Sequence, residues 1–178
     1  EHLLAAIAVA AGAGVTHISA NSLIVEENTP LNFDINGGSV LLPGEDEAFV
    51  MYEKSKEMLE SLKAKGCTLA VATSKPTEPT LRILDKFGLS KYFDVVVGSN
   101  PDGTGSEKKL IISAVVEKLQ KLEGFDKSAA VMVGDRFYDI EGGKACGIDT
   151  VGVLYGYGSE EEFRDAGATH IVARPCDV

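Results

Sequence analysis

The stretch that decides the fold runs from Ala129 to Asp139 and reads Ala-Ala-Val-Met-Val-Gly-Asp-Arg-Phe-Tyr-Asp. Its first five residues form an apolar run of strand length, which is typical of a strand buried on both faces of a parallel sheet. Gly134 then allows a sharp turn, and Asp135 and Asp139 follow at a spacing that puts two side chains on one side of a helix's first turn. The stretch therefore predicts a buried strand, a turn and a helix with two carboxylates at its start.

The same alternation of strand and helix continues over most of the chain. The expected strands are residues 68–73, 93–97, 129–133, 150–154 and 170–172, and the expected helices are residues 53–65, 80–87, 109–122, 140–146 and 160–166. Short connections between them favour an α/β protein with a Rossmann-like, doubly wound parallel sheet. Glycines such as Gly66 and Gly88 end these helices, as a left-handed cap residue does. Residues 1–50 lack this regularity, so we predict an irregular N-terminal segment and an α/β core over residues 51–178.

Composition and charge limit the classes of partner that the chain is expected to bind. The formal net charge is −10, with 17 Lys and Arg scattered among 27 acids, which disfavours binding to nucleic acid or anionic lipid. The apolar run Leu3–Ala11 is too short to span a bilayer and lacks the basic start of a secretory signal. The three cysteines, Cys67, Cys146 and Cys176, have no metal-type spacing. Their odd number favours reduced thiols, so we expect a cytoplasmic protein. From the charge and the short apolar run we expect no nucleic-acid or membrane partner.

The two carboxylates of the opening stretch form the first candidate site. In doubly wound sheets ligands bind at the carboxyl ends of the strands, where Asp135 and Asp139 are expected. Paired carboxylates suit Mg²⁺, which takes carboxylates, waters and substrate phosphate as ligands. The alternative is that Asp135 is a helix N-cap and Asp139 a solvated side chain.

Two further strand ends carry groups suited to phosphate. The strand at residues 68–73 leads into Thr73 and Ser74, whose hydroxyls, with nearby backbone N–H groups, can cradle an anion. The alternative is an ordinary cap followed by Pro76, which starts a helix. After the next strand, a loop rich in turn formers ends in Lys108 at a helix start. Cations avoid that position because the helix dipole is positive there, so Lys108 needs an anion such as phosphate, unless it is simply exposed.

Taken in order, these segments resemble the haloacid dehalogenase superfamily. The segments are residues 71–76 (Val-Ala-Thr-Ser-Lys-Pro), 98–108 and 131–140. Residues 92–99, 152–159 and 166–172 resemble its phosphoglycolate-phosphatase-like branch more narrowly. The resemblance implies that Thr73, with Ser74, binds the phosphoryl oxygens, that Lys108 neutralises charge, and that Asp135 and Asp139 bind Mg²⁺.

The family's first motif, Asp-x-Asp-Gly-Thr, is absent in that form. The nearest string is residues 32–38, Asn-Phe-Asp-Ile-Asn-Gly-Gly, which would make Asp34 the nucleophile and a metal ligand. Asn36 then replaces the second acid; it can offer a backbone carbonyl to the metal but cannot exchange a proton as a carboxyl does. Two alternatives stay open. The string can be the turn of a hairpin, since Asn-Gly is a strong turn signal, or the true motif lies upstream of Glu1.

The resemblance implies a magnesium-dependent phosphatase that hydrolyses a small phosphorylated metabolite through an aspartyl-phosphate. The cap domain of such relatives is expected to be reduced or absent here, with residues 3–11 as a candidate cap helix. The alternative function is a catalytically impaired relative that binds phosphate or a protein through the retained pocket.

Overall fold

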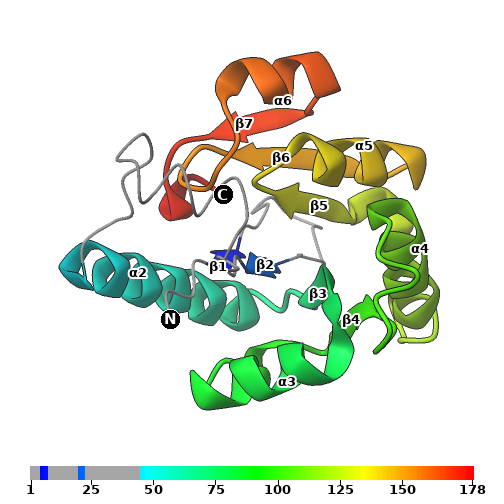
Figure 1. The fold of residues 1–178 in the computed structure, drawn as a ribbon, viewed down its shortest axis with the longest axis horizontal. Coiled ribbons are helices and arrows are strands. Elements are labelled where there is room, and N and C mark those ends of the chain that lie inside the picture. Colours follow the sequence, from blue (N-terminus) through cyan, green and yellow to red (C-terminus); the bar gives the residue numbers. More distant parts are fainter. Residues whose placement is uncertain (1–4, 8–19, 23–44) are drawn as a thin grey trace.

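The computed structural model describes residues 5–7, 20–22 and 45–178, with side chains from residue 53 onward (Figure 1). The strands are β1 (Ala5–Ile7), β2 (Ala20–Ser22), β3 (Ala70–Pro76), β4 (Val95–Ser99), β5 (Val131–Gly134), β6 (Asp149–Val153) and β7 (His170–Val172). The helices are α2 (Glu45–Ala64), α3 (Thr77–Lys86), α4 (Lys108–Leu119), α5 (Phe137–Ala145) and α6 (Glu160–Ala166).

The strands that carry the candidate site pair in parallel. β3 pairs with β4, and β6 lies between β5 and β7, with all three pairings parallel. β1 and β2 pair antiparallel, and β2 contacts both β3 and β5, so this pair lies between the two parallel groups (Figure 1). β3 and β5 therefore lie on either side of it. The α/β fold with parallel strands is the one that the sequence predicts.

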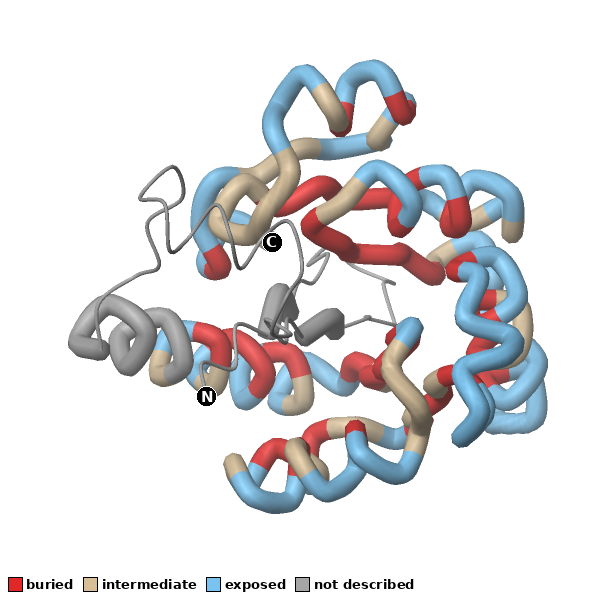
Figure 2. Tube along the Cα trace, viewed as in Figure 1, coloured by how far each residue is buried: buried red, intermediate tan, exposed pale blue. Residues whose placement is uncertain are grey.

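Both faces of the parallel strands are covered, as the apolar runs indicate. Val71 packs in a cluster with side chains of α2 and α3, whereas its neighbours Ala70 and Ala72 pack with α4. This alternation is the period-2 pattern of a strand between two layers of helices. Figure 2 shows the same burial along β5 and β6. The strands that lead to the candidate site are therefore buried.

Several boundaries differ from the predicted ones. α2 begins at Glu45, so the predicted domain boundary at residue 51 falls inside this helix. Gly66 and Gly88 follow α2 and α3 with φ of 82° and 65°, which confirms their predicted role as helix ends. The candidate cap helix at residues 3–11 is wrong for residues 5–7, because Ala5–Ile7 is a strand paired with β2.

Among the residues that the structure describes, no helix is both long and apolar enough to span a membrane.

Candidate active site

Lys108 is the residue that joins the candidate site together. It is the first residue of α4, and its side chain is only 4% exposed. Its Nζ donates a hydrogen bond to the carbonyl oxygen of Ala72 at 3.0 Å and lies 2.8 Å from Oδ1 of Asp139. The lysine thus connects the end of β3 with the start of α5. The anion that this helix start requires is supplied within the chain by Asp139.

Asp139 is fully buried in the first turn of α5. Its Oδ2 accepts a hydrogen bond from the Arg136 N–H at 3.2 Å. Its Oδ1 has the charge of Lys108 beside it but receives no well-directed hydrogen bond from any described residue. A Cβ at position 134 would lie 2.2 Å from Asp139 Cβ, so only glycine lets the carboxylate fold back over the turn. The free lone pairs of Oδ1 suit a further ligand.

Asp135 is held by the loop that follows β6. Its Oδ2 accepts a hydrogen bond from the Tyr157 N–H at 3.3 Å, and a Cβ at position 156 would lie 2.2 Å from Asp135 Cβ. Burial raises the pKa of Asp135, and the negative charge of Asp139 raises it further, against the opposing effects of the Tyr157 N–H and Lys108. The N-cap of α5 is Arg136, so the interpretation of Asp135 as the cap is wrong.

Thr73 and Ser74 lie in β3 directly after Ala72, whose carbonyl oxygen accepts the hydrogen bond from Lys108. Thr73 is buried, and its Oγ1 accepts a hydrogen bond from the Lys75 N–H at 3.2 Å. Ser74 is exposed and donates to the carbonyl oxygen of Ser106, in the loop before α4, at 2.8 Å. The structure therefore brings four of the predicted positions, those at residues 73, 108, 135 and 139, to the region where β3 and β5 end. The remaining candidates, Asp34 and Asn36, lie outside the described residues.

The carboxylates of Asp135 and Asp139 match the ligand preferences of magnesium. No cluster of three or more His, Cys, Asp or Glu side chains exists within the described part of the chain. Mg²⁺ is usually held by one or two carboxylates, with waters and phosphate oxygens completing its octahedron. The raised pKa of the buried Asp135 fits such an ion, because a nearby cation would stabilise its ionised carboxylate, whereas Asp139 already has Lys108 beside its Oδ1.

Two supporting groups escaped the sequence analysis. Glu162 of α6 accepts hydrogen bonds at its Oε1 from Arg136 Nε at 2.9 Å and from the Phe137 N–H at 2.8 Å, which fixes the start of α5. The Tyr157 backbone holds Asp135. Two glycines flank Tyr157 directly after a strand, a pattern that signals close backbone approach. Glu162 has no such signal, because its partners lie far from it in sequence.

The chain matches a known family over most of its described length. The model of the haloacid dehalogenase-like hydrolases matches residues 43–153. A 5′-nucleotidase from Pseudomonas aeruginosa is 36% identical over 69% of this chain and 54% of its own length. A phosphoglycolate phosphatase from Aquifex aeolicus is 42% identical over 60% of this chain and 48% of its own length.

Solved structures give the same result. The crystal structure of a predicted phosphatase from Clostridium acetobutylicum superposes with a TM-score of 0.64 and 42% identity, over 68% of this chain and 55% of that one. The chain thus spans about half the length of these relatives.

Proposed function

The chain belongs to the haloacid dehalogenase-like hydrolases, and from this premise we propose that it is a magnesium-dependent phosphatase of a small phosphorylated metabolite. The observation that carries the proposal is the buried Lys108, which ties the β3 end to Asp139. A lysine and two carboxylates beside the carboxyl ends of β3 and β5 provide both a cationic partner for phosphate and ligands for a divalent ion.

Each side chain then has a distinct task. Thr73 donates a hydrogen bond to the phosphoryl oxygens, and Ser74 does so once its hydroxyl turns away from the Ser106 carbonyl oxygen. Lys108 balances the negative charge that develops as the phosphoryl group transfers. Asp135 and Asp139 hold Mg²⁺, which when bound would neutralise phosphate oxygens and orient the group for in-line attack.

The proposed nucleophile is Asp34. Its carboxylate would attack phosphorus as the bond to the leaving oxygen breaks, giving an aspartyl-phosphate and an alkoxide that takes a proton from solvent water to become the alcohol. Water would then hydrolyse the aspartyl-phosphate to inorganic phosphate and restore the carboxylate. Asn36 stands where relatives carry the acid that moves these protons, so we expect slow turnover. The same feature favours the second candidate function, a phosphate-binding relative that does not turn over.

The substrate is proposed to be a small molecule. With a formal net charge of −10, the chain repels nucleic acid and anionic lipid over long range, whereas a small phosphate ester can be captured by one local lysine and a metal ion. The names of the relatives, a 5′-nucleotidase and a phosphoglycolate phosphatase, support this class of substrate.

The test is release of phosphate from p-nitrophenyl phosphate with and without Mg²⁺, using Asp135→Asn prepared in the same way as the control. We expect Mg²⁺-dependent hydrolysis that falls roughly 10²-fold or more in the variant, the scale on which removal of one charge-stabilising group acts. Equal rates for the two proteins would refute the phosphatase. Mg²⁺-dependent phosphate binding without hydrolysis would instead identify the non-catalytic candidate.

A further inference from the structure

Two aromatic rings are exposed at the start of α5, between the two carboxylates in the sequence. Phe137 is 39% exposed and Tyr138 is 37% exposed, and they are the only two aromatic side chains among the exposed large apolar residues of the described part of the chain. Their ring centroids lie 5.1 Å apart with planes at 66°, an edge-to-face pair. The pair therefore presents aromatic surface to solvent directly beside Asp135 and Asp139.

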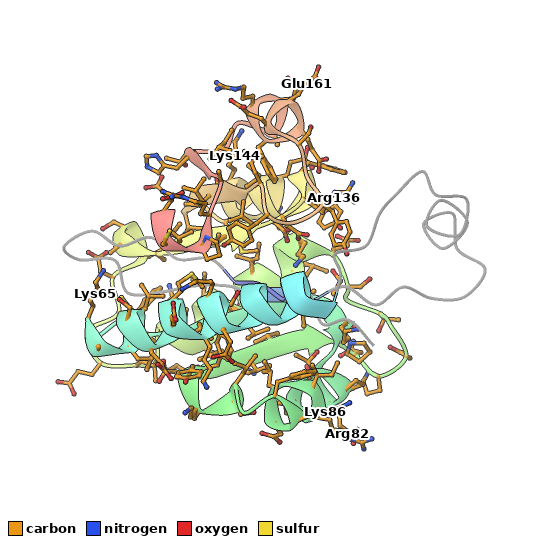
Figure 3. All side chains as sticks on the ribbon, turned by 90° about the vertical axis from the view of Figure 1, so that its left-hand side faces the viewer. Lys65, Arg82, Lys86, Arg136, Lys144 and Glu161 are labelled. Carbon is orange, nitrogen blue, oxygen red and sulfur yellow. The ribbon has the colours of Figure 1, made fainter. Side chains whose placement is uncertain are left out.

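These rings are held in place by a cation and an acid. The guanidinium carbon of Arg136 lies 5.8 Å from the Phe137 centroid and 5.4 Å from the Tyr138 centroid. Arg136 is itself fixed by its hydrogen bond to Glu162, which also accepts from the Phe137 N–H. Figure 3 shows Arg136 on the outside of the ribbon, at the start of α5. A surface fixed in this way loses little conformational entropy when a ligand covers it.

Neither ring belongs to a buried apolar cluster of the described residues. The core side of α5 is formed by Ile140, which is fully buried and packs with Phe163, whereas the two rings project outside that cluster. Exposed aromatic surface beside a candidate phosphate site is therefore better explained by a ligand than by packing.

We propose that Phe137 and Tyr138 contact a planar aromatic group of the substrate, so that the preferred substrates are phosphomonoesters carrying such a group, a nucleoside 5′-monophosphate above all. This inference rests on the proposed function, because the phosphate must sit at Asp135 and Lys108 for the rings to reach the rest of the molecule. Stacking of one base on an aromatic side chain corresponds to roughly five- to 150-fold in affinity.

The experiment measures binding by isothermal titration calorimetry in the presence of Mg²⁺. The probes are adenosine 5′-monophosphate, O-phosphotyrosine and glycerol 3-phosphate, which share a phosphate ester and differ in the group attached to it. The proteins are the wild type, Phe137→Leu/Tyr138→Leu, Tyr138→Leu alone, and Tyr138→Phe. Leucine keeps apolar bulk without a ring, and Tyr138→Phe keeps the ring without the hydroxyl.

We expect the wild type and Tyr138→Phe to bind the nucleotide at least about fivefold more tightly than glycerol 3-phosphate, and the double leucine variant to lose this preference. Tyr138→Leu should lie between them. Leu81→Ala, which removes a comparably exposed apolar side chain (41%) on α3, should bind as the wild type does. Tighter binding of O-phosphotyrosine than of the nucleotide would keep the aromatic surface and change its occupant to a phenyl ring.

Equal affinity of the wild type for all three probes would overturn the inference, as would a preference that survives the double substitution or a failure to bind any probe. Phosphate release is measured on the same samples. Hydrolysis of glycerol 3-phosphate without aromatic preference would overturn this inference alone. Ring-dependent binding without hydrolysis of any probe would overturn the phosphatase and leave the aromatic surface standing.

Discussion

The buried ion pair between Lys108 and Asp139 gives the sharpest prediction about stability. Their side chains are 4% and 0% exposed, and Nζ and Oδ1 lie 2.8 Å apart. Lys108→Met keeps the length and apolar stem of the side chain but removes its charge. It leaves Asp139 as an uncompensated buried charge and takes the hydrogen bond from the Ala72 carbonyl. Removing one partner of a buried pair costs about 3–5 kcal/mol of unfolding free energy.

The measurements are urea and thermal unfolding followed by circular dichroism, in EDTA so that no bound metal ion offsets the unpaired buried charge of Asp139. For a chain of this size each kcal/mol corresponds to roughly 2–4 °C, so Tm should fall by roughly 6–20 °C. In the double variant Lys108→Met/Asp139→Asn the buried charge is absent as well. The double variant should therefore lose less unfolding free energy than the sum of the two single-variant losses, by about 0.5–3 kcal/mol.

The chain offers a matched control. Lys63 and Asp94 also lie 2.8 Å apart, but their side chains are 32% and 38% exposed. Water screens such a pair, so Lys63→Met should cost about 1 kcal/mol or less. If Lys108→Met and Lys63→Met lower the unfolding free energy by the same amount, burial does not govern these pairs and the reasoning about the site is refuted.

Further predictions concern the carboxylates and their support. Folding raises the pKa of Asp135, so its protonation stabilises the metal-free protein at low pH, and this contribution is lost as pH rises through the raised pKa. Without metal, Asp135→Asn should thus unfold at a higher temperature than the wild type at pH 8, with the advantage vanishing below about pH 4; no advantage at pH 8 would contradict it. Mg²⁺ at about 100 times its dissociation constant should stabilise the wild type by about 2.7 kcal/mol, and Asp135→Asn markedly less, in thermal scans; equal shifts would exclude Asp135 as a ligand. Gly156→Ala places a methyl 2.2 Å from Asp135 Cβ, so it should cost about 1–3 kcal/mol of stability and lower phosphate release relative to Leu81→Ala; unchanged values for both would refute the close approach.

The strand and helix pattern was readable because it depends on local signals. The apolar run before Gly134 and the glycines that end the helices follow from burial and from backbone conformation, and the structure places a strand and helix ends there. The predicted first and last residues of the helices and strands were less accurate, because packing can extend an element beyond the residues that show a periodic apolar pattern. α2 begins at Glu45, where composition alone gave no periodic pattern.

The site was only partly predictable for a different reason. Asp135, Asp139 and Lys108 could be located because strand ends gather at one edge, although the sequence indicated phosphate as the partner of Lys108 and the structure provides Asp139. The hydrogen bond that Glu162 accepts from the Phe137 N–H joins residues far apart in sequence, and residue types alone do not specify such a pair.

Charge balance decides what this edge of the sheet can bind. With both acids ionised, Asp135 and Asp139 outweigh Lys108 by one negative charge, and Lys108 is already engaged by Asp139 and the Ala72 carbonyl. A phosphate monoester carries a charge of about −1.5 to −2 at pH 7, so the described groups alone repel it. A divalent cation bound by these carboxylates reverses the sign of the local charge. The same ion that we propose as the cofactor is therefore also the condition for substrate binding, and the exposed rings of Phe137 and Tyr138 can select among phosphate esters only once that ion is in place.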